Sequence, residues 1–181
     1  MENKVRVIVA GGGTAGWLSA YSLAKRMGNM LEITLVESEQ IGTVGVGEAT
    51  IPTMRRFHQF FGVDEQEFMR ETQGTFKLGI KFENWCKPGE SYFHSFGDIG
   101  QSTWMAEFHQ YWMEAQANGF GGSLDDYCLE LKAAEKNKFA VKVGQTPLSY
   151  AFHLNATAYA KYLRKKSELL GVKRVEGKIT K

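Results

Sequence analysis

The chain has 181 residues, of which 43% are hydrophobic and 23% charged, so it can bury the core of about one ordinary domain. Its 22 basic and 20 acidic residues are intermixed and leave a formal net charge of +2, which argues against a nucleic-acid or acidic-lipid partner. No stretch approaches the roughly 20 apolar residues of a membrane span, and the N-terminus lacks the apolar segment of a signal peptide. The two cysteines, Cys86 and Cys128, form no zinc or disulfide motif, and we expect a cytoplasmic protein.

The N-terminal segment predicts one βαβ unit. Val5–Ala10 is a continuous apolar run, which is typical of a parallel strand buried on both faces. A helical pattern begins at Thr14 and stops at Gly28. The inward stripe of this helix comprises Trp17, Tyr21 and Ala24. A second apolar strand, Ile33–Val36, follows and ends at Glu37.

Between the first strand and the helix, residues 11–16 satisfy the G-x-G-x-x-G pattern of a dinucleotide-binding turn in its required context. Gly11 permits the tight turn, Gly13 lets the backbone approach a pyrophosphate, and Gly16 lets the helix pack closely on the strand. The helix N-terminus adds free N–H groups and the positive end of the helix dipole. Glu37, about 20 residues beyond the glycines, is placed to accept hydrogen bonds from ribose hydroxyls.

The cofactor contacts that this motif predicts are Gly11, Gly13, Thr14, Ala15, Gly16 and Glu37. The alternative is a glycine turn that only packs the βαβ unit, and the complete pattern in its context favours dinucleotide binding. These residues alone do not choose between FAD and NAD.

A glycine-rich loop at residues 42–47 precedes the next predicted helix. We expect Thr50 to cap this helix, Pro52 to lie in its first turn and Gly62 to end it. Its inward residues are Met54, Phe57 and Phe61. Asp64 then begins a further helix, as the first residue of a capping box completed by Glu67.

Residues Thr75–Trp85 alternate as one strand. One face is expected to carry Phe76, Leu78, Ile80 and Phe82, and the other Lys77, Lys81 and Glu83. Residues 88–122 are rich in glycine and aromatic residues and predict long connections around short elements. Ser123 with Asp126 predicts the start of another helix.

The C-terminal segment predicts a helix at Asn155–Leu170 and a strand at Val172–Thr180. The buried stripe of the helix comprises Tyr159, Leu163 and Leu170. A basic run on the same helix is most simply a solvated face without a function; its members are Lys161, Arg164, Lys165 and Lys166. The sequence stops directly after the strand, whose edge would expose unpaired backbone groups, so we expect missing sequence or a second chain.

Three segments in order, GGGTAGW at 11–17, VGVGEATIP at 44–52 and FKLGIKFENW at 76–85, together resemble the flavin-dependent halogenases. The resemblance covers essentially the whole chain. It implies an α/β fold, the Rossmann-type FAD-binding domain of the FAD monooxygenase-like class, here truncated. It also implies a mobile strap, Gly42–Thr50, against the isoalloxazine, and glycines make that mobility plausible. The further flavin contacts carried over are Val44, Gly47, Glu48, Ala49, Thr50 and Ile179.

The activity that the resemblance implies is halogenation of an electron-rich, indole- or tryptophan-like aromatic. FADH2 from a separate flavin reductase reacts with O2 to a flavin hydroperoxide, chloride or bromide attacks it, and the resulting hypohalous acid reaches an essential lysine. Lys77 matches that lysine, as a hydrogen-bond donor or as a haloamine-forming amine. The alternative is a lysine on the solvated face of a strand, which is the better interpretation of Lys81.

His94 and Phe96 match the aromatic residues that enclose the substrate in the tryptophan halogenases. For His94, an ordinary packed or capping role is an equal alternative. For Ile179, the equal alternative is a buried position on the strand. Asn155 stands where the family commonly has aspartate, so a charged role there is in doubt. No His, Cys or carboxylate cluster has metal-ligand spacing.

The predicted organisation is one N-terminal FAD-binding part, residues 1–181, with the lysine strand at 75–85 and the start of the substrate region at about 88–122. The family's Trp-x-Trp-x-Ile-Pro motif, second catalytic glutamate and halide-binding loop are absent from these residues. We therefore expect the remaining C-terminal segment of the enzyme to be needed for turnover. An FAD-dependent aromatic hydroxylase and a non-catalytic FAD-binding domain remain the alternatives.

Overall fold

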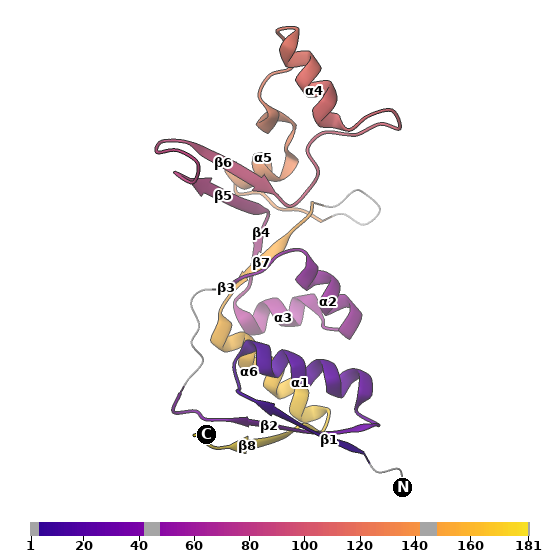
Figure 1. The fold of residues 1–181 in the computed structure, drawn as a ribbon, viewed down its shortest axis with the longest axis vertical. Helices are drawn as coiled ribbons and strands as arrows, with labels where there is room; N and C mark the ends of the chain where they lie inside the picture. The colour runs from indigo at the N-terminus through magenta and orange to yellow at the C-terminus, as the bar shows by residue number, and fades with distance from the viewer. Residues whose placement is uncertain (1–3, 42–47, 142–147, 181) are drawn as a thin grey trace. The chain divides into compact units, whose positions relative to one another are not determined.

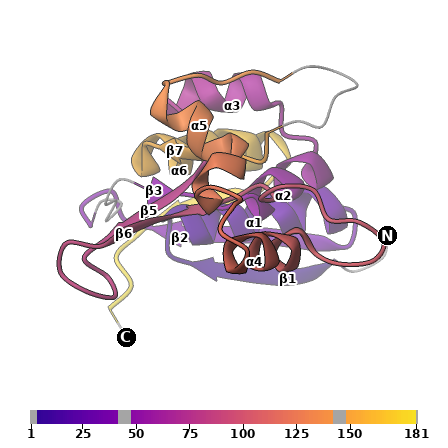
Figure 2. The same ribbon diagram turned by 90° about the horizontal axis from the view of Figure 1, so that it is seen from above.

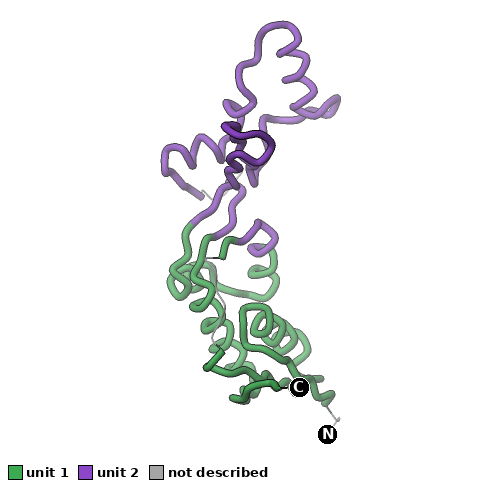
Figure 3. The backbone as a smooth tube through the Cα atoms, turned by 60° about the vertical axis from the view of Figure 1, so that its left-hand side comes forward, with its two compact units in different colours: residues 1–49, 56–75, 153–181 green, residues 50–55, 76–152 purple. Residues whose placement is uncertain are grey.

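The computed structural model describes residues 4–41, 48–141 and 148–180. The chain divides into two compact units (Figure 3). Unit 1 comprises residues 1–49, 56–75 and 153–181, and unit 2 comprises residues 50–55 and 76–152. Among the described residues, no helix is long and apolar enough to cross a membrane.

Unit 1 contains a parallel sheet in the order β1-β2-β8. Its strands are β1 (Val5–Ala10), β2 (Leu31–Glu37) and β8 (Lys173–Glu176). In the register, Val7 lies opposite Ile33, and Leu35 lies opposite Arg174. The predicted βαβ unit is thereby confirmed.

The expectation that the first strand is buried on both faces is wrong. The side chain of Ile8 is 73% exposed and that of Val5 is also exposed, whereas Ile33 and Leu35 of β2 are buried. The two views in Figures 1 and 2 show α1 over β1 and β2 on one side of the sheet. Among the described residues, the apolar run of β1 therefore belongs to a strand that a helix covers on one face.

Two long helices pack together in unit 1, α1 (Thr14–Met27) and α6 (Ala156–Leu169). The predicted stripe of α1 is buried, with Ala20 added to it. Asn155 caps α6, its side-chain oxygen accepting a hydrogen bond from the Ala158 N–H at 3.0 Å. Leu170 follows the helix as its C-cap and is exposed, so its predicted place on the buried stripe is wrong. The last strand ends at Glu176 rather than Thr180, because its partner β2 ends at Glu37, which lies opposite Glu176.

The helices α2 (Thr53–Phe61) and α3 (Glu65–Thr72) follow the first sheet strands. Thr50 does not cap α2, and Pro52 precedes it, so both predictions are wrong. The Thr50 hydroxyl instead accepts the N–H of Phe152 at 2.9 Å and donates to the carbonyl of the same residue at 3.2 Å. The predicted cap at Asp64 is confirmed, since its carboxylate accepts the Glu67 N–H at 2.6 Å.

A second sheet has the order β3-β7-β4, with β3 (Glu48–Ala49) antiparallel to β7 (Ala151–Leu154) and with β4 (Thr75–Lys77) at the other edge. In unit 2, β5 (Gly79–Glu83) and β6 (Ser91–Ser95) form an antiparallel hairpin. The predicted single strand is therefore two strands in different sheets. The change of sheet falls at Leu78, whose carbonyl accepts the Phe96 N–H at 3.0 Å.

Unit 2 also contains three short helical elements, α4 (Phe108–Ala117), the 3₁₀ turn η1 (Leu124–Tyr127) and α5 (Leu129–Glu135). The sequence predicted no helix at α4, because residues 88–122 are irregular in period, and none of the residues of α4 is buried. Ser123 caps η1 through its hydroxyl, which accepts the Asp125 N–H. The helix predicted to start there is thus a single 3₁₀ turn followed by α5.

Candidate functional site

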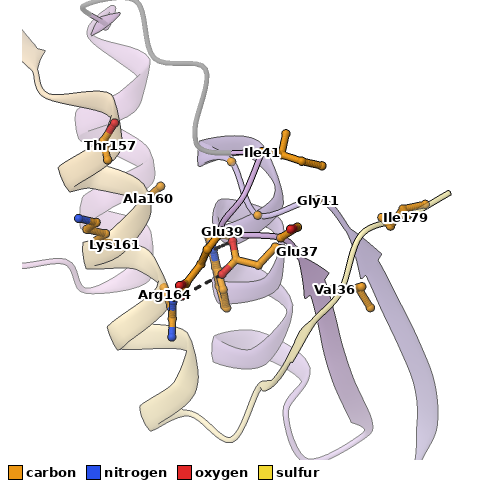
Figure 4. A pocket seen from close by; sticks show the side chains of 15 residues that line it. Gly11, Val36, Glu37, Glu39, Ile41, Thr157, Ala160, Lys161, Arg164 and Ile179 are labelled. Carbon is orange, nitrogen blue, oxygen red and sulfur yellow. Dashed lines mark hydrogen bonds and ion pairs between the residues drawn. The ribbon is translucent and has the colours of Figure 1, made fainter.

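A pocket of about 580 Å³ opens beside the glycine turn of unit 1 (Figure 4). It is bordered by the turn, the end of β2, one side of α6 and the residues after β8. The predicted contacts that line it are Gly11, Gly13, Glu37 and Ile179. Its size suits one part of an extended cofactor, and both polar and apolar side chains line it.

Three glycines of the turn each lack a side chain for a different structural reason. Gly11 has a φ of +108°, a conformation that favours glycine. A Cβ on Gly16 would lie 1.9 Å from the Gly11 carbonyl oxygen, so the predicted close approach of helix and strand is present. A Cβ on Gly12 would lie 1.5 Å from a carboxylate oxygen of Glu37. The need for Gly12 was not foreseen from the sequence, because the pattern leaves that position open.

Gly13 differs from Gly12 and Gly16, because a Cβ there would meet no atom of the described residues within 4 Å, and from Gly11, because its φ of −74° suits other residues. Its absent side chain therefore leaves open space at the start of α1. Thr14 and Ala15 begin that helix, whose first N–H groups have no intrahelical acceptor and whose first turn carries no acidic residue. The Thr14 hydroxyl is buried and has no hydrogen-bond partner among the described residues. This donor set fits a pyrophosphate.

Glu37 is held by donors from two sides. Its Oε1 accepts from Nε of Arg174 at 2.6 Å, and its Oε2 accepts from the indole N–H of Trp17 at 3.2 Å. Each carboxylate oxygen can accept a further hydrogen bond, so the group can still receive ribose hydroxyls. Arg174 also donates to Glu39 at 2.9 Å and to Glu176. Neither Trp17 nor Arg174 was foreseen as a contributor to the site.

The sequence predicted that the basic side of α6 is a solvated face without a function, but two of its residues line the pocket. Lys161 and Arg164 line the pocket, and Figure 4 shows Arg164 turned toward Glu37 and Glu39. Arg164 lies 3.6 Å from the Glu37 carboxylate. Periodicity identified one face of the helix correctly but not the acidic residues opposite it.

Of the remaining predicted flavin contacts, Ile179 lines this pocket, and the others are not among its lining residues or lie outside the described chain. Val44 and Gly47 lie outside the described residues. Glu48 and Ala49 form β3 and do not line the pocket. Ile179 lies on the exposed segment after β8, across the pocket from α6 in Figure 4.

Unit 2 places the second candidate site around Lys77. Lys77 is only 9% exposed, which contradicts its alternative interpretation as a solvated strand lysine. Its Nζ donates a hydrogen bond to the Thr50 carbonyl at 3.2 Å and lies 5.2 Å from the centre of the Phe96 ring. Burial lowers the pKa of the Lys77 amine below its ordinary value. Lys81, by contrast, is exposed and pairs with Glu83, as expected.

The two predicted substrate residues have different surroundings. Phe96 lies beside the amine of Lys77. His94 lies opposite Ile80 in the hairpin, is exposed, and makes no hydrogen bond or ring contact with the residues that the structure describes.

The burial of a histidine and of a glutamate outside these sites was not predicted from the sequence. His58 of α2 is 3% exposed, and its Nε2 lies 2.8 Å from the Tyr159 hydroxyl. Burial lowers the pKa of His58 to about 4. Its spacing of three residues from Phe61 was the only signal for an inward position. Glu130 of α5 is also buried, in unit 2. The short segment that forms α5 shows no helical periodicity that would have indicated this burial.

A parallel βαβ sheet with a glycine turn and a carboxylate at the end of its second strand defines a dinucleotide-binding protein of the α/β class. A family model described as tryptophan halogenase matches residues 6–181. The chain therefore belongs to the tryptophan halogenase family, and the resemblance seen in the sequence is confirmed.

Solved structures and curated relatives agree with this assignment. The structure of Xcc4156, a flavin-dependent halogenase from Xanthomonas campestris, matches with a TM-score of 0.92 and 50% identity over 98% of this chain and 36% of that one. The tryptophan 7-halogenase RebH from Lentzea aerocolonigenes is 34% identical over 99% of this chain and 37% of its own length. The tryptophan 6-halogenase SttH from Streptomyces toxytricini is 32% identical over 96% of this chain and 38% of its own length. The predicted Rossmann-type α/β fold is confirmed, and the chain spans little more than a third of the length of these relatives.

Proposed function

We propose that the protein carrying this chain is a flavin-dependent halogenase acting on an electron-rich aromatic of the indole or tryptophan class. The observation that carries the proposal is the buried amine of Lys77 beside the ring of Phe96, in a chain of the tryptophan halogenase family. A buried lysine needs a reason, because lysine is among the residues that are rarely buried without a partner.

FAD is the proposed cofactor, bound in unit 1. The start of α1 would hold the pyrophosphate, with Gly13 leaving space for it, and Glu37 would accept the ribose hydroxyls. Ile179 and the strap residues Val44, Gly47, Glu48, Ala49 and Thr50 complete the proposed contacts. When bound, reduced flavin would supply two electrons to O2, and the halide would supply the other two as it is converted to hypohalous acid.

Lys77 would deliver that oxidant to the substrate. As an ammonium group it has three donors, of which the Thr50 carbonyl takes one, so the others can polarise hypohalous acid. The lowered pKa also increases the fraction of free amine, which is the form that can become a haloamine. Phe96, and His94 in the proposed substrate complex, would present flat walls to a planar ring.

The test uses the intact protein with FADH2, O2 and bromide or chloride. Lys77→Ala should leave flavin binding and the reoxidation rate of reduced flavin unchanged while halogenated product disappears. Lys77→Arg should be nearly as impaired, because a guanidinium is bulkier and does not become a neutral amine. Lys81→Ala is the matched control and should behave as wild type, since Lys81 is an exposed lysine on β5, four residues along the chain.

Normal halogenation by Lys77→Ala would overturn the role of the lysine. A product that carries oxygen and forms equally without halide would identify an aromatic hydroxylase instead. The proposal further includes a separate flavin reductase as the source of FADH2, a cytoplasmic location, and residues 1–181 as the N-terminal FAD-binding part that needs the C-terminal segment for turnover.

A further inference from the structure

Glu130 is a buried carboxyl group that joins three segments of unit 2. It belongs to the first turn of α5 and is 4% exposed. Its Oε1 accepts the backbone N–H of Ser149 at 3.0 Å, and its Oε2 accepts the hydroxyl of Ser95 at 3.3 Å. The hydrogen bonds of Glu130 in the described residues are thus to neutral donors. A buried carboxyl group in such a place is expensive, so its partners must be well placed.

The same group fixes the turn that follows β6. The Ser95 hydroxyl accepts the N–H of Gly97 at 3.0 Å while it donates to Glu130. Gly97 packs directly against the carboxyl group, because a Cβ at this position would lie 1.9 Å from Oε1 of Glu130. The turn at Ser95–Gly97 is therefore held by one hydroxyl and one carboxyl group.

Phe96 is the central residue of that turn. Its N–H donates to the Leu78 carbonyl, one residue beyond Lys77, and its ring lies 5.2 Å from the amine of Lys77. A shift of the turn would move this ring relative to the amine. Through these contacts, Glu130 affects the distance between the Lys77 amine and the Phe96 ring.

We propose that Glu130 is a positioning residue that sets where the aromatic substrate lies relative to Lys77, and so which ring carbon receives the halogen. This inference rests on the proposed function. Glu130 acts through Ser95, Gly97 and Phe96 and does not itself touch the reacting atoms. Displacements of about 1 Å at a reacting centre can cost on the order of a hundredfold in rate, so a group that only holds a turn can govern catalysis.

The first test compares variants of the intact enzyme. Glu130→Ala should lower kcat/KM for the aromatic substrate by about tenfold to a hundredfold and broaden the distribution of product isomers. The rate of flavin reoxidation should not change. Glu130→Gln should restore most of the loss, because its amide oxygen can still accept the Ser149 N–H and its NH2 can donate to Ser95. Glu135→Ala is the matched control, an exposed glutamate of the same helix, and should behave as wild type.

A double-mutant cycle tests the contact itself. Gly97→Ala should impair the enzyme much as Glu130→Ala does, because the new methyl group meets the carboxyl group. In the Glu130→Ala background the same substitution should cost far less, since the colliding atoms are gone. Equal costs in both backgrounds would overturn the proposed contact. If Glu130→Ala fails to fold, Glu130→Gln and Ser95→Ala carry the comparison, the latter removing only the hydroxyl.

Amide hydrogen exchange separates this inference from the proposed function. Glu130→Ala should speed exchange at Gly97 and Ser149 and leave the paired amides of the β5–β6 hairpin unchanged. If wild type does not halogenate but exchange changes in this way, the proposed function fails while the positioning of the turn stands. If wild type halogenates and Glu130→Ala keeps its kcat/KM, isomer distribution and exchange rates, the Glu130 inference is overturned.

Discussion

The glycine turn of unit 1 depends on atoms that are absent, whereas the lysine cluster of unit 2 depends on polar groups that are present and buried. An added Cβ at Gly16 would meet the backbone at 1.9 Å. At Lys77, the backbone carbonyl of Thr50 and the ring of Phe96 surround an amine that is almost withdrawn from water. The turn is therefore vulnerable to enlargement and the cluster to the loss of a partner.

Within the turn, Gly13→Val should abolish flavin retention without loss of stability. Nothing of the protein lies within 4 Å of the new Cβ, and the backbone at Gly13 has a φ of −74°, which suits other residues. A branched side chain would instead enter the proposed pyrophosphate path. Flavin titration and thermal unfolding of the same sample check both halves. Unchanged flavin affinity would show that Gly13 does not face the cofactor.

Gly16→Ala should have the opposite signature. Its methyl group meets the Gly11 carbonyl, and backbone atoms cannot move aside as a flexible side chain can, so we expect a loss of roughly 3 kcal/mol or more in the free energy of unfolding. Denaturant unfolding measures it. Gly13→Ala is the matched control and should lie within about 0.5 kcal/mol of wild type. Similar losses in both variants would contradict the division of roles between the two glycines.

The buried histidine of unit 1 should make stability depend on pH. Burial lowers the pKa of folded His58 from 6.5 to about 4, so between these values the unfolded state binds a proton that the folded state does not. The free energy of unfolding should therefore fall as pH decreases from 6.5 toward 4, by roughly 3 kcal/mol at most. His58→Gln should flatten this dependence when unfolding is measured at several pH values. An unchanged slope would assign the acid sensitivity to other groups.

Arg174→Ala should weaken flavin binding by about tenfold, because Glu37 loses one of the donors that hold it toward the pocket. Arg174→Lys should recover only part of the affinity, since one ammonium group cannot reproduce the guanidinium bonds to Glu37 and Glu39. Lys173→Ala, next to it on β8, removes an exposed ion pair with Glu32 and should leave flavin affinity unchanged. An equal effect from Lys173→Ala would indicate a general charge effect and not positioning.

In unit 2, Thr50→Val should cost about 1–2 kcal/mol in the free energy of unfolding. The variant keeps the shape and the backbone carbonyl that accepts the Lys77 amine, but it removes the hydroxyl that accepts the Phe152 N–H. Thr53→Val, at an exposed position, should lie within about 0.5 kcal/mol of wild type. Equal stability of Thr50→Val and wild type would show that the hydroxyl contributes little to the site.

Much of unit 1 could be predicted because its signals are local. The glycine turn places its three pattern glycines and the carboxylate of Glu37 within one βαβ unit, and the burial pattern of α1 follows from helical spacing. The cap at Asp64 likewise depends on neighbours three residues apart. Where the same local rules were applied beyond their range, at Thr50 and Leu170, they assigned a cap and a buried position that the structure does not have.

The class of fold and the nucleotide turn could thus be predicted from local sequence patterns, and a family resemblance led to the proposal that Lys77 is the reactive lysine. The tertiary packing established that Lys77 is buried, because β4 and β5 pair with different strands and the alternation of one strand does not cross that change. It also decided that Arg164 and Arg174 meet Glu37, and that Glu130 meets Ser95 and Gly97. These contacts join residues between about thirty and nearly 140 positions apart. Neighbouring residues determine the local backbone geometry, whereas the partner of a polar side chain depends on which distant segment packs against it.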